Sequence, residues 1–493
     1  MRGYYTADEV RAAEAPLLAS LPDGALMRRA AHGLATVVAA ELRARTGGVA
    51  GRTITVLVGS GDNGGDALWA GAMLRKRGVA ATAVLLKPEK AHAAGLAAFT
   101  AAGGRVAAPS DDLGLPDLVI DGIVGISGRG PLRPDAAALV DRIEAPIVSA
   151  DLPSGVDPDT GAVDGPAVRA AVTVAFGALK PVHALGAAQC GRVELVRIGL
   201  SLGDAGITAL DAADVGAAWP VPGAEDDKYS QGVVGVVAGS DGYPGAGVLC
   251  TGAAVTATSG LVRYAGPCTG EVLAHAPEVI ATAELAKAGR VQSWVVGPGM
   301  GTDDAARRTL RTVLDADVPV LVDADGLTLL AEDPDLVRSR TAATLLTPHA
   351  GEFARLTGKD PGPDRVASVR TLAADWNAHV LLKGRATVIA GPSGLVFVNE
   401  AGGSWSATAG AGDVLAGIIG ALMAAGLTPD RAAAVGARAH SLAANLAARG
   451  GGADLSAGRG TAPISAGTLL AHLRESIRVL RAGVSPEEMP ATS

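Results

Sequence analysis

The chain has 493 residues, which is more than one ordinary hydrophobic core accommodates and favours two domains. Hydrophobic residues make up 48% of the chain and charged residues 19%, a composition typical of a globular protein and not of a disordered one. The formal net charge of -8, without any cluster of Lys or Arg, argues against a nucleic acid or a membrane surface as partner.

Three cysteines, Cys190, Cys250 and Cys268, are scattered along the chain. Their number is odd and their spacing is not that of metal ligands, so they predict neither a disulfide framework nor a metal site. The first 20 residues contain acids and an Arg where a signal peptide needs an unbroken apolar core. We therefore expect a protein of the reducing cytoplasm.

Residues 53–155 repeat a pattern of apolar strand, glycine turn and helix. Residues 53–58 are a β-branched run, a glycine loop follows, and residues 67–78 have helical spacing. Further apolar runs at 117–125 and 145–155 end in Gly, Asp or Pro. Strands that alternate with helices predict a parallel sheet whose site lies at the carboxyl ends of the strands. We expect a Rossmann-like α/β sandwich.

The periodicity breaks near residues 215–228, where Pro, Gly and acids accumulate. This predicts one domain over 1–220 and a second over 225–485. The second half is again an α/β series. It closes with two amphipathic helical patterns within 430–450 and 466–483.

The segment "ATAGAGDVLAG", residues 407–417, places one carboxylate, Asp413, behind small residues at the head of an apolar helix. Backbone amides at Gly410 and Gly412 would suit a phosphate, because free N–H groups and the helix dipole favour an anion there. A carboxylate in the same place would repel that phosphate. Its proximity predicts a general base that takes a proton from an attacking hydroxyl.

Taken alone, "GAGD" is weak evidence, because an Asp in the first turn of a helix is a common dipole partner. Four motifs that precede it in order strengthen the interpretation: "GPGMG", "DADG", "TPHAGE" and "KGRAT". Lys383, between an apolar strand and a glycine, is placed to meet phosphate oxygens. His349 could equally be a helix-start residue or a ligand contact.

These motifs resemble the ribokinase-like superfamily, and more closely the ADP-dependent dehydratase half of the NAD(P)H-hydrate repair enzymes, over residues 225–480. The stretch "GSDGYPGAGVL" belongs to the same resemblance. Residues 1–215 are similar to the epimerase half, through "GSGDNGGDA", "DGIVGISGRGP" and "ADLPSGVDPDTG". The resemblance implies an N-terminal Rossmann-like three-layer sandwich followed by a ribokinase-like α/β domain.

The resemblance also implies the chemistry. Damaged NADH or NADPH carries a hydroxyl at C6 of the nicotinamide ring, and phosphorylation turns this poor leaving group into a good one. ADP would be the donor, giving AMP and phosphate once elimination restores the cofactor. Asp413 would be the base. The hydrate would contact Ala246, Gly301, His349 and Asp413, and the nucleotide would contact Lys383, Gly384, Arg385, Ala386, Thr387, Gly410 and Gly412.

In the first half the resemblance implies epimerisation of the R and S hydrates, because the dehydratase accepts only the S form. Asp151 would be the acid/base on the C6 hydroxyl. Potassium would be held by oxygens of Asn63, Asp121 and Ser154, which suits a hard cation. The hydrate would contact Asp62, Asn63, Gly64, Gly65, Asp66, Gly125, Ile126, Ser127, Gly128, Arg129, Gly130, Pro131 and Asp151.

Two other functions stay open. One is a ribokinase-like kinase of a vitamin-precursor alcohol with an N-terminal nucleotide-binding module, and the other is a nucleotide sensor without turnover. We expect NADHX, NADPHX and ADP as ligands, magnesium near Asp323 and Glu352, and a homo-oligomer.

Overall fold

In this computed structural model, residues 1–450 and 460–483 are described, and the chain forms two compact units. The first unit comprises residues 3–207, and the second comprises residues 1–2 and the chain from 208 onward. Composition placed the boundary later, near 215–228. The difference arises because α8 (Ala212–Ala218) packs against α19 (Leu473–Arg481), so its contacts belong to the second unit. Residue 485, the expected end of the second domain, lies outside the described residues.

The first unit is built on a parallel sheet of seven strands in the order β4-β3-β2-β5-β6-β7-β8. The strands are β2 (Thr53–Val58), β3 (Ala80–Leu85), β4 (Arg105–Ala107), β5 (Leu118–Gly122), β6 (Ile147–Ala150), β7 (Val172–Phe176) and β8 (Arg192–Val196). The chain runs outward from β2 to β4 and then returns to the other side of β2. The strand order therefore reverses between β2 and β5, which is where open α/β sheets bind their ligands.

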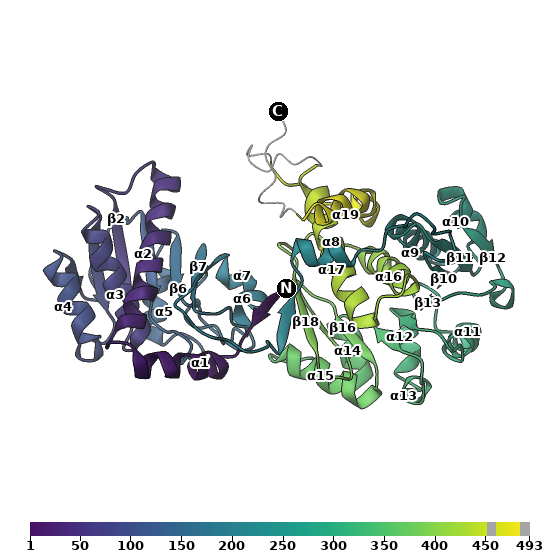
Figure 1. The fold of residues 1–493 in the computed structure, drawn as a ribbon, viewed down its shortest axis with the longest axis horizontal. Helices are drawn as coiled ribbons and strands as arrows, with labels where there is room; N and C mark the ends of the chain where they lie inside the picture. Colours follow the sequence, from purple (N-terminus) through teal and green to yellow (C-terminus); the bar gives the residue numbers. More distant parts are fainter. Residues whose placement is uncertain (451–459, 484–493) are drawn as a thin grey trace. The chain divides into compact units, whose positions relative to one another are not determined.

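Helices cover both faces of this sheet (Figure 1). The helices of this unit are α1 (Ala7–Ser20), α2 (Ala25–Thr46), α3 (Asp62–Arg75), α4 (Ala93–Ala101), α5 (Pro134–Asp141), α6 (Val182–Leu185) and α7 (Ala187–Cys190), with a 3-10 turn η1 (Pro88–Lys90). Successive strand residues point to opposite faces: Val56 joins the core beneath α2 and α3, and Leu57 joins the core beneath α5. The predicted three-layer α/β sandwich is confirmed.

The second unit is built on an 11-stranded sheet in the order β1-β9-β18-β17-β16-β15-β14-β13-β10-β11-β12, in which β1 and β9 contain the residues where the chain divides. Its strands are β1 (Arg2–Tyr4), β9 (Ile207–Ala209), β10 (Val233–Val237), β11 (Leu261–Ala265), β12 (Ile280–Thr282), β13 (Ser293–Val296), β14 (Val320–Val322), β15 (Thr344–Leu346), β16 (His379–Leu382), β17 (Ala386–Ala390) and β18 (Val396–Glu400). The pairs from β12 through β16 are parallel, and β17 pairs antiparallel with both neighbours. The α/β series predicted for this half is confirmed.

Helix α16 (Ala411–Ala424) lies in the centre of the second core and fixes the position of Asp413. A Cβ at Gly417 would lie 2.1 Å from the carbonyl oxygen of Cys250 on α9 (Pro244–Ala257). A Cβ at Gly420 would lie 2.0 Å from a methyl group of Val295 on β13. Glycine at both positions therefore lets the helix lie directly against α9 and the sheet.

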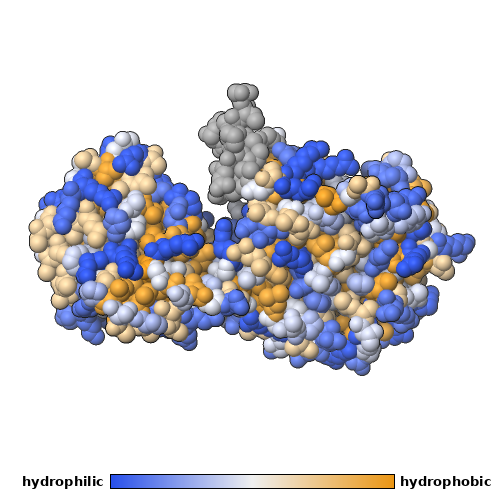
Figure 2. Space-filling view, in the orientation of Figure 1, coloured by the Kyte–Doolittle hydropathy of each residue, from blue (hydrophilic) through white to orange (hydrophobic). Residues whose placement is uncertain are grey.

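The remaining helices surround this core. They are α10 (Thr269–His275), α11 (Asp304–Leu314), α12 (Asp325–Leu330), α13 (Asp335–Arg338), α14 (Ala350–Thr357), α15 (Arg365–Trp376), α17 (Pro429–Ala448) and α18 (Ala466–Ala471), with a 3-10 turn η2 (Leu285–Lys287). The first predicted closing helix is α17. The second is divided at His472 into α18 and α19. Among the described residues no helix has the length and apolarity to cross a membrane. The surface seen in Figure 2 carries hydrophilic and hydrophobic residues on both units.

Candidate functional sites

A cavity of about 790 Å³ opens in the first unit at the carboxyl ends of β2, β5, β6 and β7. It is the position that the reversal of strand order predicts. Its walls come from the glycine turn after β2, the loop after β5, and the segments that follow β6 and β7. Strand ends far apart in the sequence thus contribute to one site.

The glycine turn reads G-x-G-x-x-G over residues 59–64, from the end of β2 into the first turn of α3. A Cβ at Gly59 would lie 1.8 Å from the carbonyl oxygen of Ile123, and one at Gly64 would lie 2.5 Å from the oxygen of Gly59. Gly61 has open space around it and lines the cavity. The first and third glycines thus permit close packing, and the second lets a ligand approach the backbone. The spacing is visible in the sequence, although no prediction rested on it.

Of the five residues predicted from this turn, Asp62, Asn63 and Asp66 line the cavity. Gly64 and Gly65 lie behind it. A Cβ at Gly65 would lie 2.8 Å from the methyl group of Met27 on α2. Gly64 therefore packs against the turn itself, and Gly65 packs against α2.

Asp121, at the end of β5, is completely buried and is surrounded by donors. Ser154 donates from Oγ (2.7 Å) and from its backbone N–H (3.0 Å), and Ser149 Oγ donates at 2.9 Å. Burial raises the pKa of Asp121, and the hydrogen bonds from Ser154 oppose that rise. The structure thus brings two of the three predicted potassium ligands into direct contact.

The third predicted ligand, Asn63, is 7% exposed, and its side-chain nitrogen has no hydrogen-bond partner. A flip of the amide exchanges its oxygen and nitrogen, so Asn63 presents a buried amide end with an unmet partner. Ser154 Oγ also lies 3.3 Å from the carbonyl oxygen of Val124. Carboxylate, hydroxyl, carbonyl and amide oxygens suit a hard cation such as potassium, so the residues present fit that ion. In the described part of the chain no group of three His, Cys, Asp or Glu could hold a metal.

Asp151, directly after β6, forms a buried ion pair with Lys180. Asp151 has a φ of +65°, a left-handed conformation that costs energy for a residue other than glycine and is often found at functional sites. Lys180 is 1% exposed and also donates to the carbonyl oxygen of Phe176 at 2.9 Å. Nδ1 of His183 accepts a hydrogen bond from the backbone N–H of Lys180. The proton of the neutral ring is therefore on Nε2, which donates to the carbonyl oxygen of Asp151. Burial lowers the pKa of His183 to about 4, which keeps its ring neutral at pH 7.

Sequence reasoning missed Lys180, although its context is that of Lys383: a lysine just after an apolar strand. It also missed Glu14 on α1, which lines the cavity and makes no hydrogen bond or ion pair among the described residues. Burial, followed by the charge of Asp151, raises the pKa of both Glu14 and Asp66. No sequence motif joins Glu14 to the strand ends, which it meets only in the fold.

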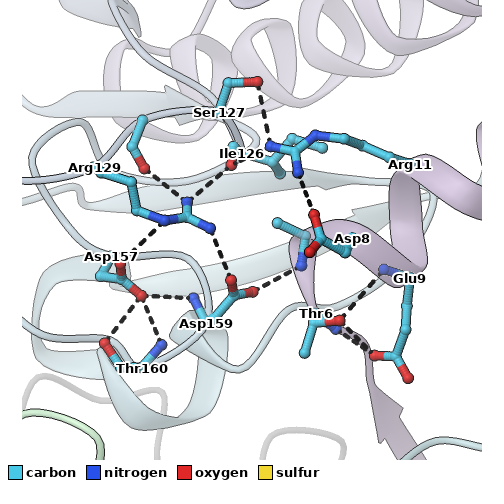
Figure 3. Close-up of polar contacts among 12 residues, drawn as sticks. Thr6, Asp8, Glu9, Arg11, Ile126, Ser127, Arg129, Asp157, Asp159 and Thr160 are labelled. Atoms are coloured by element: carbon cyan, nitrogen blue, oxygen red, sulfur yellow. Dashed lines mark hydrogen bonds and ion pairs between the residues drawn. The ribbon is translucent and has the colours of Figure 1, made fainter.

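The loop after β5 is held by two arginines (Figure 3). Arg129 contacts Asp159 at 2.9 Å and Asp157 at 3.6 Å, and Arg11 on α1 donates to the carbonyl oxygen of Ile126 at 3.1 Å. All the residues predicted from this loop line the cavity: Gly125, Ile126, Ser127, Gly128, Arg129, Gly130 and Pro131. The guanidinium of Arg129 is already paired with two carboxylates. The contacts observed for Arg129 are therefore contacts that hold the loop in place.

In the second unit the predicted lysine sits between two carboxylates. The ammonium group of Lys383, just after β16, lies 2.7 Å from Asp323 and 3.7 Å from Glu352. Asp323 follows β14, and Glu352 lies in the first turn of α14. The nearby carboxylates raise the pKa of Lys383 against the effect of its burial.

Asp413 is the third residue of α16, and no side-chain hydrogen bond caps the start of that helix. Burial, followed by the charge of Asp323, raises its pKa to about 6. A Cβ at Gly412 would lie 3.5 Å from the Lys383 ammonium, which places the helix start beside Lys383. His440 on α17 contacts the carbonyl oxygen of Ala411 at 2.9 Å and secures this start.

The predicted hydrate contacts Ala246, Gly301 and His349 come from the segments that follow β10, β13 and β15. A Cβ at Gly299 would lie 2.7 Å from the side chain of Ala246, so the turn after β13 meets α9. Gly301 donates its N–H to Asp325 at 2.9 Å. His349 caps α14 by accepting from the N–H groups of Gly351 and Glu352, and its side chain is 60% exposed. The helix-start role is therefore observed for His349, and its exposed ring stays available to a ligand.

The predicted nucleotide segment 383–387 turns from β16 into β17. Arg385 lies 3.3 Å from Glu400, Thr387 Oγ1 donates to the carbonyl oxygen of Gly384 at 3.3 Å, and Ala386 is buried in β17. Lys383 and the helix start at Gly410 and Gly412 are the members of the predicted nucleotide set that adjoin Asp413.

Comparison with known proteins agrees with both halves. A family model described as NAD(P)H-hydrate dehydratase matches residues 234–458, and one described as YjeF-related protein N-terminus matches residues 23–182. The bifunctional NAD(P)H-hydrate repair enzyme Nnr of Mycobacterium tuberculosis H37Rv is 64% identical over 437 residues, covering 88% of this chain and 92% of that protein. The Corynebacterium glutamicum protein of the same name is 38% identical, covering 86% and 87%.

One solved structure among the matches is the ADP/ATP-dependent NAD(P)H-hydrate dehydratase of Bacillus subtilis, co-crystallised with ATP and Mg²⁺. It is 25% identical with a TM-score of 0.47, covering 55% of this chain and 98% of that one. On the strength of the mycobacterial match over most of both chains, this chain belongs to the family of bifunctional NAD(P)H-hydrate repair enzymes, with an epimerase and a dehydratase domain.

Proposed function

We propose that the second unit removes water from the S hydrate of NADH or NADPH at the expense of ADP, and that the first unit interconverts the R and S hydrates. The observation that carries the dehydratase assignment is the carboxylate of Asp413 at a helix start beside Lys383. A helix start and a lysine attract phosphate, and a carboxylate between them requires a role in proton transfer.

In the dehydration, Asp413 takes the proton of the C6 hydroxyl, and the resulting oxygen attacks the terminal phosphate of ADP. The bond to AMP breaks, and elimination of the new phosphate ester restores the dihydropyridine ring. Lys383 and the free amides at Gly410 and Gly412 stabilise the charge that builds up on the transferred phosphate.

Magnesium would accompany the nucleotide and neutralise phosphate charge. Carboxylate oxygens are the protein ligands that magnesium takes, so Asp323 and Glu352 fit it by chemistry. Both carboxylates already face Lys383, at 2.7 and 3.7 Å. We expect Lys383 to share these carboxylates with the ion when the nucleotide binds.

In the epimerisation, Asp151 acts on the C6 hydroxyl. The carboxylate of Asp151 pairs with the buried ammonium of Lys180, and a carboxylate so placed can accept the proton that is removed. Potassium, held by Asn63, Asp121 and Ser154, would supply a positive charge beside the substrate. The neutral ring of His183 holds the Asp151 backbone in its left-handed conformation.

The dehydration should depend on pH through Asp413. A base must be ionised to accept a proton, and the pKa of Asp413 is raised to about 6. We therefore expect kcat/KM for the S hydrate to rise between pH 5 and 7, with a midpoint near 6. The return of absorbance at 340 nm measures it. A rate that is flat over this range would contradict the assignment of Asp413 as the base.

The two activities should separate on truncation. Residues 3–207 form a compact unit with its own cores, so they should fold alone and still equilibrate the R and S hydrates. Circular dichroism checks folding, and chromatography of the two hydrates checks turnover. A folded fragment that leaves the R hydrate unchanged would refute the epimerase assignment.

Family membership does not favour the alternative of a vitamin-precursor kinase. That function predicts a stable phosphorylated product with ATP and no return of the 340 nm band, and a sensor predicts binding without turnover. The preference for ADP over ATP, a homo-oligomeric state and a cytoplasmic location remain proposals.

A further inference from the structure

The basic side chains that line the cavity of the first unit fall into two groups: those that pair with carboxylates and those that do not. Five basic residues line it: Arg11, Lys87, Arg129, Arg133 and Lys180. Three of them contact carboxylates, since Arg11 pairs with Asp8, Arg129 with Asp157 and Asp159, and Lys180 with Asp151. The side chains of Lys87 and Arg133 have no hydrogen bond or ion pair with any described residue. Two positive charges of the cavity wall are therefore left for a ligand.

Lys87 occupies a position with a known physical role in sheets of this strand order. It follows β3, the strand beside β2 on the side away from β5. In dinucleotide-binding sheets this strand end meets the ribose of the adenosine, about 20 residues beyond the glycine turn. An acid there accepts a hydrogen bond from a free 2′-hydroxyl, and a cation there binds a 2′-phosphate.

The other requirements of that arrangement are present in this unit. The turn from 59 to 64 has the glycine spacing, and Gly61 leaves its backbone open to the cavity. The reactive end of the cavity, at Asp151 and Lys180, lies on the opposite side of the reversal in strand order. A dinucleotide with its nicotinamide at Asp151 would thus extend its adenosine toward β3.

No acid takes the place of Lys87. The nearest one along the chain, Glu89, is exposed on η1 and does not line the cavity. Lys87 itself is half-buried in the wall. A 2′-hydroxyl would find no carboxylate acceptor from this strand end, whereas a 2′-phosphate would find an unpaired ammonium group.

We propose that Lys87 binds the 2′-phosphate of the adenosine ribose, so that the epimerase unit favours the hydrate of NADPH over the hydrate of NADH. This assignment rests on the proposed epimerase function and specifies the substrate of that site. Arg133 is the second unpaired cation at the same cavity and can share the phosphate.

The test compares both hydrates in the full-length chain without ADP, so that dehydration does not proceed. Lys87→Gln removes the charge, and Lys90→Gln is the matched control, because Lys90 lies on the 3-10 turn η1 directly after Lys87 but does not line the cavity. We expect Lys87→Gln to lower kcat/KM for the NADPH hydrate by roughly 10- to 100-fold, the value of a charge-assisted hydrogen bond. The NADH hydrate and the Lys90→Gln variant should stay within about twofold of the wild type.

Two results would overturn the proposal. Equal losses on both hydrates would place Lys87 on a part that they share, such as the pyrophosphate, and unchanged rates on both would make Lys87 a solvated side chain.

Lys87→Glu should reverse the preference toward the NADH hydrate.

Calorimetry separates this proposal from the epimerase assignment. Adenosine 2′,5′-bisphosphate should bind Lys87→Gln more weakly than the wild type, and AMP should bind both equally. If the wild type epimerises neither hydrate yet this difference is seen, the epimerase function fails and the phosphate contact stands. If the bisphosphate binds both proteins alike, the contact is refuted.

Discussion

Asp151→Asn is expected to lower epimerisation by roughly 10²- to 10⁴-fold, the usual contribution of a general acid or base, and to leave the ADP-driven dehydration of the S hydrate intact. Asn keeps the shape of the side chain and tolerates the left-handed backbone at φ +65°, so the fold has no steric reason to change. What the substitution removes is the proton acceptor and the partner of Lys180. Chromatography of the R and S hydrates, with the 340 nm assay as the internal control, measures both activities.

The loss of charge also leaves the ammonium of Lys180 buried without a partner. Removing one member of a buried ion pair typically costs about 3–5 kcal/mol, so Asp151→Asn should melt at a lower temperature than the wild type. The double variant Asp151→Asn with Lys180→Gln removes the unpaired charge and should recover much of that stability. Recovery of epimerisation in the double variant would mean that Asp151 is structural; stability without activity is the expected result.

The sequence could predict those parts of both sites that follow strands. Asp121, Asp151, Asp323 and Lys383 each stand directly after an apolar run, and His349 follows one after Thr347 and Pro348. In a parallel sheet such strand ends meet at one edge. The strand pattern therefore indicates which edge of its sheet each of these residues occupies. The same reasoning could have included Lys180, which follows β7, and the glycine spacing of residues 59–64.

Other features could not be read from the pattern. Glu14 lies on a helix that precedes the sheet, and only the tertiary fold brings it into the cavity wall. The structure divides the chain at residue 207, earlier than the break in composition near 215–228, because α8 lies within a segment of low periodicity. Its packing partner α19 is more than 250 residues further along the chain. Contacts over such separations leave no local trace in composition.

Asp413→Asn should abolish most of the dehydration while ADP still binds. Asn preserves the volume of the side chain and removes the proton acceptor, so turnover should fall by roughly 10²- to 10⁴-fold. The affinity for ADP should stay equal or increase, because a negative charge beside the nucleotide phosphates is removed. Absorbance at 340 nm follows turnover, and calorimetry follows ADP binding.

Stability distinguishes a catalytic role for Asp413 from a capping role. The pKa of Asp413 is raised to about 6, so its ionised form at pH 7 opposes folding, and Asn should leave the melting temperature unchanged or higher. The matched control is Asp430→Asn, which removes an acid from the first turn of α17, away from the site. That variant should dehydrate the S hydrate like the wild type. If Asp413→Asn did the same, Asp413 would be no more than a dipole partner of its helix, and the proposed base mechanism would fall.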